Sequence, residues 1–153
     1  MKFKEFKQKI ISKYVYPILK FYWRTFKPKS RGVKCVITFG EEILLIRNTY
    51  GGRHWTFSGG GAKRVETPEE AVKREVMEEV GLAIEKPKPI GNLDWGYEGK
   101  KDVIYCFAAE VNSKNFKIDT TEILEAKWFK IAEVPALPPF AQKIFVLWQN
   151  KVF

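Results

Sequence analysis

Residues 60–82 read GGAKRVETPEEAVKREVMEEVGL, a glycine-rich turn followed by a helix whose two ends are both marked in the sequence. Thr67 is a typical N-cap residue, Pro68 suits the first helical position and Glu70 completes a capping box. Gly81 supplies the residue type that most often ends a helix in a left-handed conformation. The stretch therefore predicts a helix that begins at Thr67 and ends before Gly81.

Three carboxylates lie on one side of this predicted helix. Glu75, Glu78 and Glu79 stand at positions i, i+3 and i+4, so their side chains project together within an arc of about 100°. Like charges this close repel one another, and the helix gains no stability from them alone. Clusters of oxygen ligands suit hard cations such as Mg²⁺ or Mn²⁺. The alternative is an ordinary solvated acidic face, and the spacing by itself leaves both open.

Two further residues connect the turn to the helix. Glu66 lies just before the N-cap, and Arg74 lies beside the three carboxylates. We expect Glu66 and Arg74 to form a salt bridge that ties the glycine turn to the helix. Backbone groups of the turn and the carboxylates of the helix can then meet at one place.

The rest of the chain alternates strand and helix patterns. Strands are expected at residues 33–39, 43–47, 90–93, 103–111 and 126–130, with a short one near 55–57 and a last helix at 139–149. The first two strands form a predicted hairpin around Gly40. Val72, Val76 and Val80 give the acidic helix an apolar stripe for packing. Such intermixing predicts an α/β fold in which helices cover a mixed sheet.

The charge of the chain is concentrated at its beginning. The 153 residues carry a formal net charge of +9, and all of it lies in residues 1–31, because acidic and basic side chains balance in the remainder. Aromatic and aliphatic residues recur there every three or four positions between lysines, which predicts a basic amphipathic helix that Pro17 ends or kinks. We therefore expect an arm at residues 1–31 and a domain at residues 32–153.

The partner of this arm stays open. Its apolar face can pack against the domain or a second protomer while the lysines face water. A lysine-rich helix with Trp23 and Phe26 also suits an anionic membrane surface, where each basic residue contributes on the order of 1 kcal/mol. Nucleic acid, through phosphate contacts and ring stacking, is the less favoured partner.

Composition excludes several classes of protein. With 45% hydrophobic residues the chain can bury a core, and no apolar run is long enough to cross a membrane. No signal-peptide pattern is present. Cys35 and Cys106 are too few for a disulfide scaffold and are expected to be reduced core thiols. Together with the single His54 they cannot complete a zinc site. A cytoplasmic location follows as an expectation, with peripheral attachment to a membrane surface as the alternative.

The fixed positions of residues 60–82 resemble the Nudix box throughout. They are Gly60, five residues, Glu66, seven residues, Arg74-Glu75-Val76, one residue, Glu78-Glu79, one residue and Gly81-Leu82. Such a match arises by chance about once in 10⁸ start positions. A looser resemblance runs from Val33 to the last helix and does not include the arm. The Nudix family implies an α/β/α sandwich and hydrolysis of a pyrophosphate bond in a nucleoside di- or triphosphate derivative by metal-activated water.

The same resemblance implies roles for individual residues. Metal binding of Mg²⁺ or Mn²⁺ falls to Glu75, Glu78 and Glu79, with a backbone carbonyl at Gly60 or its neighbour. Glu66 and Arg74 become structural supports. A further acidic residue before the last strand often joins the site as metal ligand or general base, and Glu122 is our candidate, ahead of Glu125 and Glu98.

Substrate contacts are expected around this site. An aromatic ring can stack on a base and a cation can bind phosphate, which indicates Trp55, Arg47, Arg53 and Lys63. Core packing of a strand is the alternative for Trp55. Ser58, Lys63 and Val65 depart from residues that the family often has at these positions, and Lys63 places a cation beside the expected metal. These departures concern the substrate more than the fold.

Two other functions stay open. One is removal of phosphates from the 5′ end of RNA, with the arm holding the strand. The other is a non-catalytic Nudix binding module, docked by its arm to a membrane or a protein. The intact set of motif glutamates argues against the second. The favoured partner is a nucleotide-type small molecule.

Overall fold

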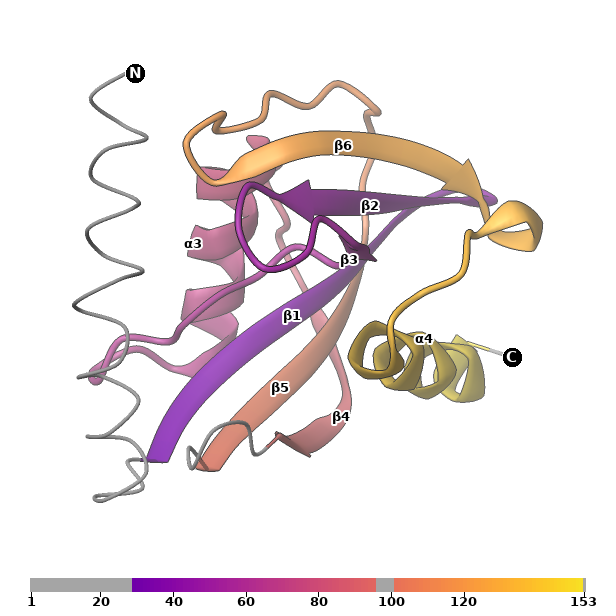
Figure 1. The fold of residues 1–153 in the computed structure, drawn as a ribbon. Helices are drawn as coiled ribbons and strands as arrows, with labels where there is room; N and C mark the ends of the chain where they lie inside the picture. Colours follow the sequence, from indigo (N-terminus) through magenta and orange to yellow (C-terminus); the bar gives the residue numbers. More distant parts are fainter. Residues whose placement is uncertain (1–28, 96–100, 153) are drawn as a thin grey trace. The chain divides into compact units, whose positions relative to one another are not determined.

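The computed structural model describes residues 29–95 and 101–152 of the chain (Figure 1). The elements in chain order are β1 (Lys29–Phe39), β2 (Glu42–Asn48), β3 (Trp55–Thr56), α3 (Pro68–Val80), β4 (Lys88–Trp95), β5 (Lys101–Glu110), β6 (Ile123–Lys130), a 3-10 turn at Ile131–Glu133 and α4 (Pro139–Val152). Every strand and both helices expected between residues 33 and 149 are present.

The chain divides into two compact units. The first comprises residues 1–30 and 94–103, and within it the Ser30 hydroxyl donates a hydrogen bond to the Asp102 carboxylate. Nearly all of the predicted arm lies outside the described residues, so its helix and its boundary stay predictions. The second unit comprises residues 31–93 and 104–153 and contains both helices and the residues of the candidate site.

Strand β2 is the centre of the six-stranded sheet, whose order is β3-β2-β1-β5-β4 with β6 paired to β2. Along one edge β2 pairs antiparallel with β6 from Glu42 opposite Lys130 to Asn48 opposite Ile123. Along the other edge it pairs first with β1, at Leu44 opposite Ile37, and then with β3. β1 pairs with β2 only from Ile37 to Phe39, and the segment that follows β3 forms bridges to the earlier part of β1, at Gly32 and Cys35.

Each face of the sheet is covered by one helix, as Figure 1 shows for α3 and α4. On the α3 face, Val33, Cys35 and Ile37 of β1 pack in one apolar cluster with the valine stripe of the helix. On the α4 face, Val36 belongs to a second cluster that contains Phe57 and Ile144. Alternate side chains of β1 point to opposite faces because a strand repeats every two residues. The predicted α/β/α sandwich is thus confirmed.

Both predicted ends of α3 are confirmed by their hydrogen bonds. The Thr67 hydroxyl accepts from the Glu70 amide at 3.2 Å, and the Glu70 carboxylate accepts from the Thr67 amide at 2.8 Å. At the other end Gly81 adopts φ 65° and donates its amide to the Met77 carbonyl. The helix is therefore fixed in register at both ends, which sets where its three site glutamates project.

The two cysteines and the hydropathy of the helices agree with expectation. Cys35 and Cys106 are free thiols in the core, and burial raises the pKa of Cys106 to about 11. Between residues 29 and 152, leaving aside 96–100, no helix is both long and apolar enough to span a bilayer.

Candidate functional site

A glycine segment after β3 lies against the first half of β1 and forms one wall of the site. Backbone hydrogen bonds join the Cys35 amide to the Ser58 carbonyl and the Val33 amide to the Gly60 carbonyl, both at 2.9 Å. Gly59 has φ 135°, and a Cβ on it would lie 2.2 Å from the Val33 carbonyl oxygen. Only glycine fits between strand and turn at this position.

Glu79 reaches from α3 to this segment and is 5% exposed. Its Oε2 accepts a hydrogen bond from the Ser58 hydroxyl at 2.6 Å and from the Gly59 amide at 2.8 Å. Burial raises the pKa of Glu79, and the two hydrogen bonds and Lys34 counteract part of that rise. Ser58, which departs from the residue common in the family, is therefore a direct hydrogen-bond donor to a site carboxylate.

Glu75 lies over the next glycine and is 8% exposed. A Cβ on Gly60 would lie 2.6 Å from Glu75 Oε2, so the missing side chain leaves the space that the carboxylate fills. The Gly60 carbonyl, predicted as a metal ligand, accepts a hydrogen bond from Val33 and keeps a second lone pair. Two buried carboxylates thus border one glycine turn.

Arg74 joins the remaining acidic side chains. Its guanidinium binds both oxygens of Glu66, at 2.6 Å from Nε and 3.0 Å from Nη2. Its Nη1 donates to Glu75 at 2.8 Å and to Glu78 at 3.0 Å. The hydrogen bonds from Arg74 and from the Lys63 amide lower the pKa of Glu66 to about 2. The guanidinium therefore orients two of the three predicted metal ligands.

Two basic residues of β1 that the sequence did not single out also belong to the site. The Lys34 ammonium donates to the Phe57 carbonyl at 2.9 Å and to the Gly59 carbonyl at 2.7 Å. Burial lowers the pKa of Lys34, while Glu79 and Glu75 oppose that change. A lysine within the otherwise apolar run VKCVI was the available sequence signal, because a cation that is even half-buried needs a partner.

Arg31 is the second of these residues. Its Nη2 donates to the carbonyls of Lys63, Arg64 and Glu66 at 2.9, 3.0 and 3.2 Å. This single nitrogen therefore faces three carbonyls of the loop between the glycine turn and α3. Nothing in the local pattern of β1 marks the contact, since its partners lie more than thirty residues along the chain.

The four predicted substrate contacts do not form one group. The Arg47 guanidinium lies 4.2 Å from the centre of the Trp55 ring and pairs with Glu125 at 3.3 Å. Trp55 also packs edge-on against the Phe129 ring at 4.9 Å, so it is partly a packing residue. The side chains of Arg53 and Lys63 are exposed, and the described residues offer them no hydrogen bond or ion pair. Arg47 and Trp55 are therefore in contact, whereas the side chains of Arg53 and Lys63 lie in solvent.

The predicted proton acceptor lies in the turn immediately before β6. Glu122 is exposed, and its carbonyl accepts hydrogen bonds from the Thr49 amide and hydroxyl. Glu125, the weaker candidate, is paired with Arg47. Glu98 lies outside the described residues.

The donor set suits a hard divalent cation. Carboxylate oxygens and glycine carbonyls are the ligands that Mg²⁺ and Mn²⁺ prefer, and the space at Gly60 is held open for a carboxylate. Within residues 29–95 and 101–152, no three acidic, histidine or cysteine side chains already converge on one point. Instead Arg74 holds Glu75 and Glu78, while Glu79 turns to Ser58.

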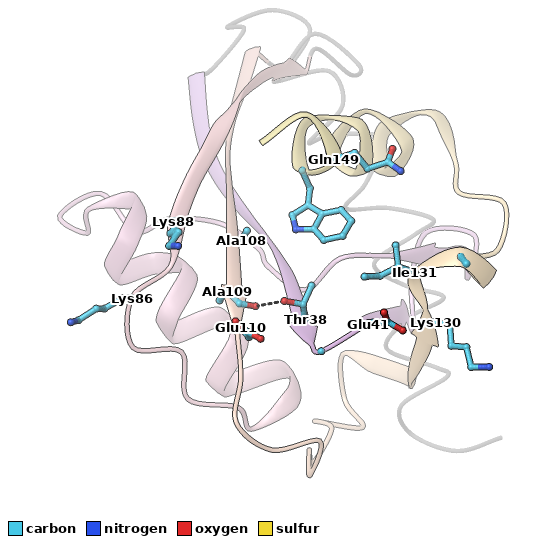
Figure 2. A pocket seen from close by; sticks show the side chains of 13 residues that line it. Thr38, Glu41, Lys86, Lys88, Ala108, Ala109, Glu110, Lys130, Ile131 and Gln149 are labelled. Atoms are coloured by element: carbon cyan, nitrogen blue, oxygen red, sulfur yellow. Dashed lines mark hydrogen bonds between the residues drawn. The ribbon is translucent and has the colours of Figure 1, made fainter. Parts of the chain in front are cut away.

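A pocket of about 810 Å³ lies elsewhere, beneath α4 at the far end of β1 (Figure 2). None of the predicted site residues lines it. Thr38 and Ala109 line its sheet side (Figure 2), and Trp148 of α4 is also among its lining residues. Its charged side chains are exposed and of both signs: Lys86, Lys88, Lys130, Glu41 and Glu110. The pocket therefore offers no buried charge that would select a ligand.

Known proteins resemble this chain in sequence and in fold. Residues 28–148 match the family described as the NUDIX domain. The chain is 36% identical over 101 residues to the NAD-capped RNA hydrolase NudC of Escherichia coli O9:H4 (strain HS) and to that of Escherichia fergusonii. Each match covers 65% of this chain, which spans only 38% of the length of these curated relatives.

Solved structures show the same fold. The MutT protein from Methanosarcina mazei Go1 superimposes with a TM-score of 0.70 at 25% identity, covering 83% of this chain and 98% of that one. The MutT NUDIX hydrolase from Burkholderia pseudomallei gives a TM-score of 0.72 at 23% identity, with coverage of 78% and 98%. The match over residues 28–148 includes the glycine turn and the whole of α3. The chain belongs to the NUDIX domain family.

Proposed function

We propose that this chain hydrolyses a pyrophosphate bond in a nucleoside di- or triphosphate derivative with the help of Mg²⁺ or Mn²⁺. The observation that carries the proposal is the placement of Glu75 and Glu79, two buried carboxylates on one turn of α3, against the Gly59–Gly60 turn. Burying carboxylates is costly unless a cation or hydrogen bonds compensate. A divalent cation beside them would provide that compensation.

The residues of the chain divide the work between them. Glu75, Glu78 and Glu79, with a glycine carbonyl, would hold the ion, and Arg74 fixes the Glu75 and Glu78 carboxylates in place. When bound, the ion neutralises phosphate charge and makes a water molecule more acidic. Glu122 is the proposed proton acceptor through a carboxylate oxygen. Arg47 and Trp55 offer a cation and a ring for phosphate and base.

The substrate is proposed only to its class. The curated relatives are hydrolases of NAD-capped RNA, which favours a dinucleotide or an RNA 5′ end as the second candidate within that class. A basic arm at residues 1–31 suits the phosphates of an RNA strand, and an anionic membrane surface is the other proposed partner. We also propose that the chain consists of an arm at residues 1–31 and a domain at residues 32–153.

The test is product release from nucleoside triphosphates, ADP-ribose, NAD and NAD-capped RNA, with Mg²⁺ and with Mn²⁺. Wild type is compared with Glu78→Gln and Glu79→Gln, for which we expect at least about a hundredfold loss of kcat. Glu69→Gln is the matched control, because Glu69 lies on the same helix, is as exposed as Glu78 and also belongs to an i,i+4 ion pair.

Two results would redirect the proposal. A folded protein that turns over none of these compounds would favour the binding-module function. Turnover that survives both substitutions would show that the acidic site is elsewhere. Loss of activity on capped RNA alone at raised salt would favour the RNA substrate, because contacts to the backbone phosphates weaken as salt rises.

A further inference from the structure

A positive charge of the chain itself lies in the proposed metal site. The Lys34 ammonium donates to the carbonyls of Phe57 and Gly59, at 2.9 and 2.7 Å. It is half-buried, and no carboxylate forms a direct ion pair with it among the described residues. Neither the fold nor the proposed chemistry requires a lysine here, since a neutral donor could satisfy the two carbonyls.

Gly59 connects this lysine to the carboxylates. Its amide donates to Glu79 Oε2 at 2.8 Å, while its carbonyl accepts from Lys34 Nζ at 2.7 Å. One glycine residue therefore separates a buried carboxylate from an ammonium group. Glu79 and Glu75 are also the two carboxylates whose charges raise the pKa of Lys34. The Lys34 ammonium is hydrogen-bonded to the glycine turn, and its electric field acts on the same carboxylates that a divalent cation would bind.

The Gly59 carbonyl matters for a second reason. A glycine carbonyl of this turn is one of the expected metal ligands, and the carbonyls of both Gly59 and Gly60 already accept hydrogen bonds. The Gly60 carbonyl accepts from a neutral amide, which competes weakly with a cation. The Gly59 carbonyl accepts from a full positive charge, which repels a cation brought to its other lone pair.

We propose that Lys34 is a resident counter-cation that weakens divalent-ion binding by the Glu75–Glu79 site. It offsets part of the carboxylate charge and occupies the Gly59 carbonyl, so the substrate-free protein binds Mn²⁺ loosely. The inference rests on the proposed metal dependence. Lys34 is a positioning residue in this scheme, since it acts through Gly59 and Glu79.

The test is Mn²⁺ binding to the full chain without substrate, with free Mn²⁺ followed by electron paramagnetic resonance. Lys34→Gln keeps a donor for the carbonyls and removes the charge, so we expect it to bind Mn²⁺ roughly tenfold more tightly. Lys34→Arg keeps the charge and should stay within about twofold of wild type. Lys73→Gln removes an exposed lysine of α3 that pairs with Glu69 and is the matched control. Unchanged or weaker binding by Lys34→Gln would overturn the proposal.

A second measurement does not depend on the folding of Lys34→Gln. In wild type, the side-chain ¹⁵N signal of Lys34 should shift when Mg²⁺ is added, while that of Lys73 should not. A Lys34 signal that does not move contradicts the proposal. If wild type binds Mn²⁺ and Lys34→Gln binds it no more tightly, only the inference about Lys34 is overturned. Absence of Mn²⁺ binding by both proteins removes the proposed metal dependence as well.

Discussion

At the scale of single residues, the glycine turn depends on how closely β1 approaches it. At Gly59 the backbone is left-handed and a Cβ would collide with the Val33 carbonyl, whereas at Gly61 a Cβ would meet nothing within 4 Å. We expect Gly59→Ala to lower the free energy of unfolding by about 3 kcal/mol or more, because a backbone atom must move. Gly61→Ala should change it by less than about 1 kcal/mol. Urea unfolding of both variants checks the difference, and equal effects would contradict the described turn.

A second residue-scale prediction concerns acid. Arg74 holds the pKa of Glu66 at about 2 in the folded chain, well below its usual value of 4.5. The unfolded chain therefore binds this proton first as pH falls, and the stability that Glu66 contributes is present above about pH 4.5 and lost toward pH 2. The Glu66→Gln protein should be less stable at pH 6 and should lose less stability between pH 5 and pH 3.

The measurement is a series of urea unfolding curves across that pH range. Glu69→Gln is the control, because among the described residues the Glu69 carboxylate pairs with Lys73 at the surface of the same helix. If Glu66→Gln and wild type lose stability in parallel as the pH falls, the Arg74–Glu66 pair does not hold in solution.

At the scale of elements, α3 carries the site because both of its ends are fixed. A helix that slipped by one residue would rotate its side chains by about 100° and would turn Glu75 and Glu79 away from the glycine turn. The capping box at Thr67 and the left-handed Gly81 prevent such a slip. The apolar stripe packed on β1 then selects the face of the helix that meets the sheet.

We therefore predict the effect of removing the cap. Thr67→Ala should lower the free energy of unfolding by about 1 kcal/mol, because the Glu70 amide loses its acceptor. Thr67→Ser retains a hydroxyl and should lie within about 0.5 kcal/mol of wild type. Chemical denaturation measures both values. A Thr67→Ser protein as unstable as Thr67→Ala would mean that the methyl group, and not the hydroxyl, stabilises this end.

Strand β1 connects the sheet to the glycine segment of the candidate site. It pairs with β2 at its end and with the glycine segment at its beginning, so it joins the core of the sheet to the site. β1 begins at Lys29, four residues before the predicted start, and its bridges to the glycine segment lie at Gly32 and Cys35. The bridge at Gly32 therefore lies outside the strand that the local pattern predicted.

At the scale of the whole molecule, the residues that stabilise the fold and those proposed to bind a metal lie in different places. Two apolar clusters, one on each face of the sheet, hold the second unit together, and Glu75 and Glu79 lie at their border with the turn. A chelator should therefore abolish hydrolysis and leave the chain folded. A ligand that binds only the folded state raises its stability with concentration.

The corresponding prediction is a rise of Tm with Mn²⁺ concentration. For wild type, Mn²⁺ at about 100 times its Kd should add about 2.7 kcal/mol to the free energy of unfolding. Glu79→Gln should show little or no rise, while Glu69→Gln should follow wild type. Differential scanning calorimetry, with Ca²⁺-free buffer and a chelator baseline, measures it. A rise that persists in Glu79→Gln would place the ion at another site.

The sequence alone determined the helix of the site, because its signals are local. Caps, a four-residue apolar step and three glutamates on one side all lie within residues 60–82, and their spacing fixes which side chains project together. The sandwich followed from the order of strands and helices, and from the family resemblance. The arm at residues 1–31 lies almost wholly outside the described residues, so its helix remains a prediction from the sequence.

The tertiary structure alone decided which distant residues complete the site. Lys34 and Arg31 bind carbonyls more than twenty residues away, and no local period encodes a contact between β1 and the glycine turn. Arg47, a predicted substrate contact, lies over Trp55 and beside Glu125, because antiparallel pairing of β2 with β3 and β6 puts the three residues opposite one another. Such contacts depend on strand register, which the packing of the whole sheet sets.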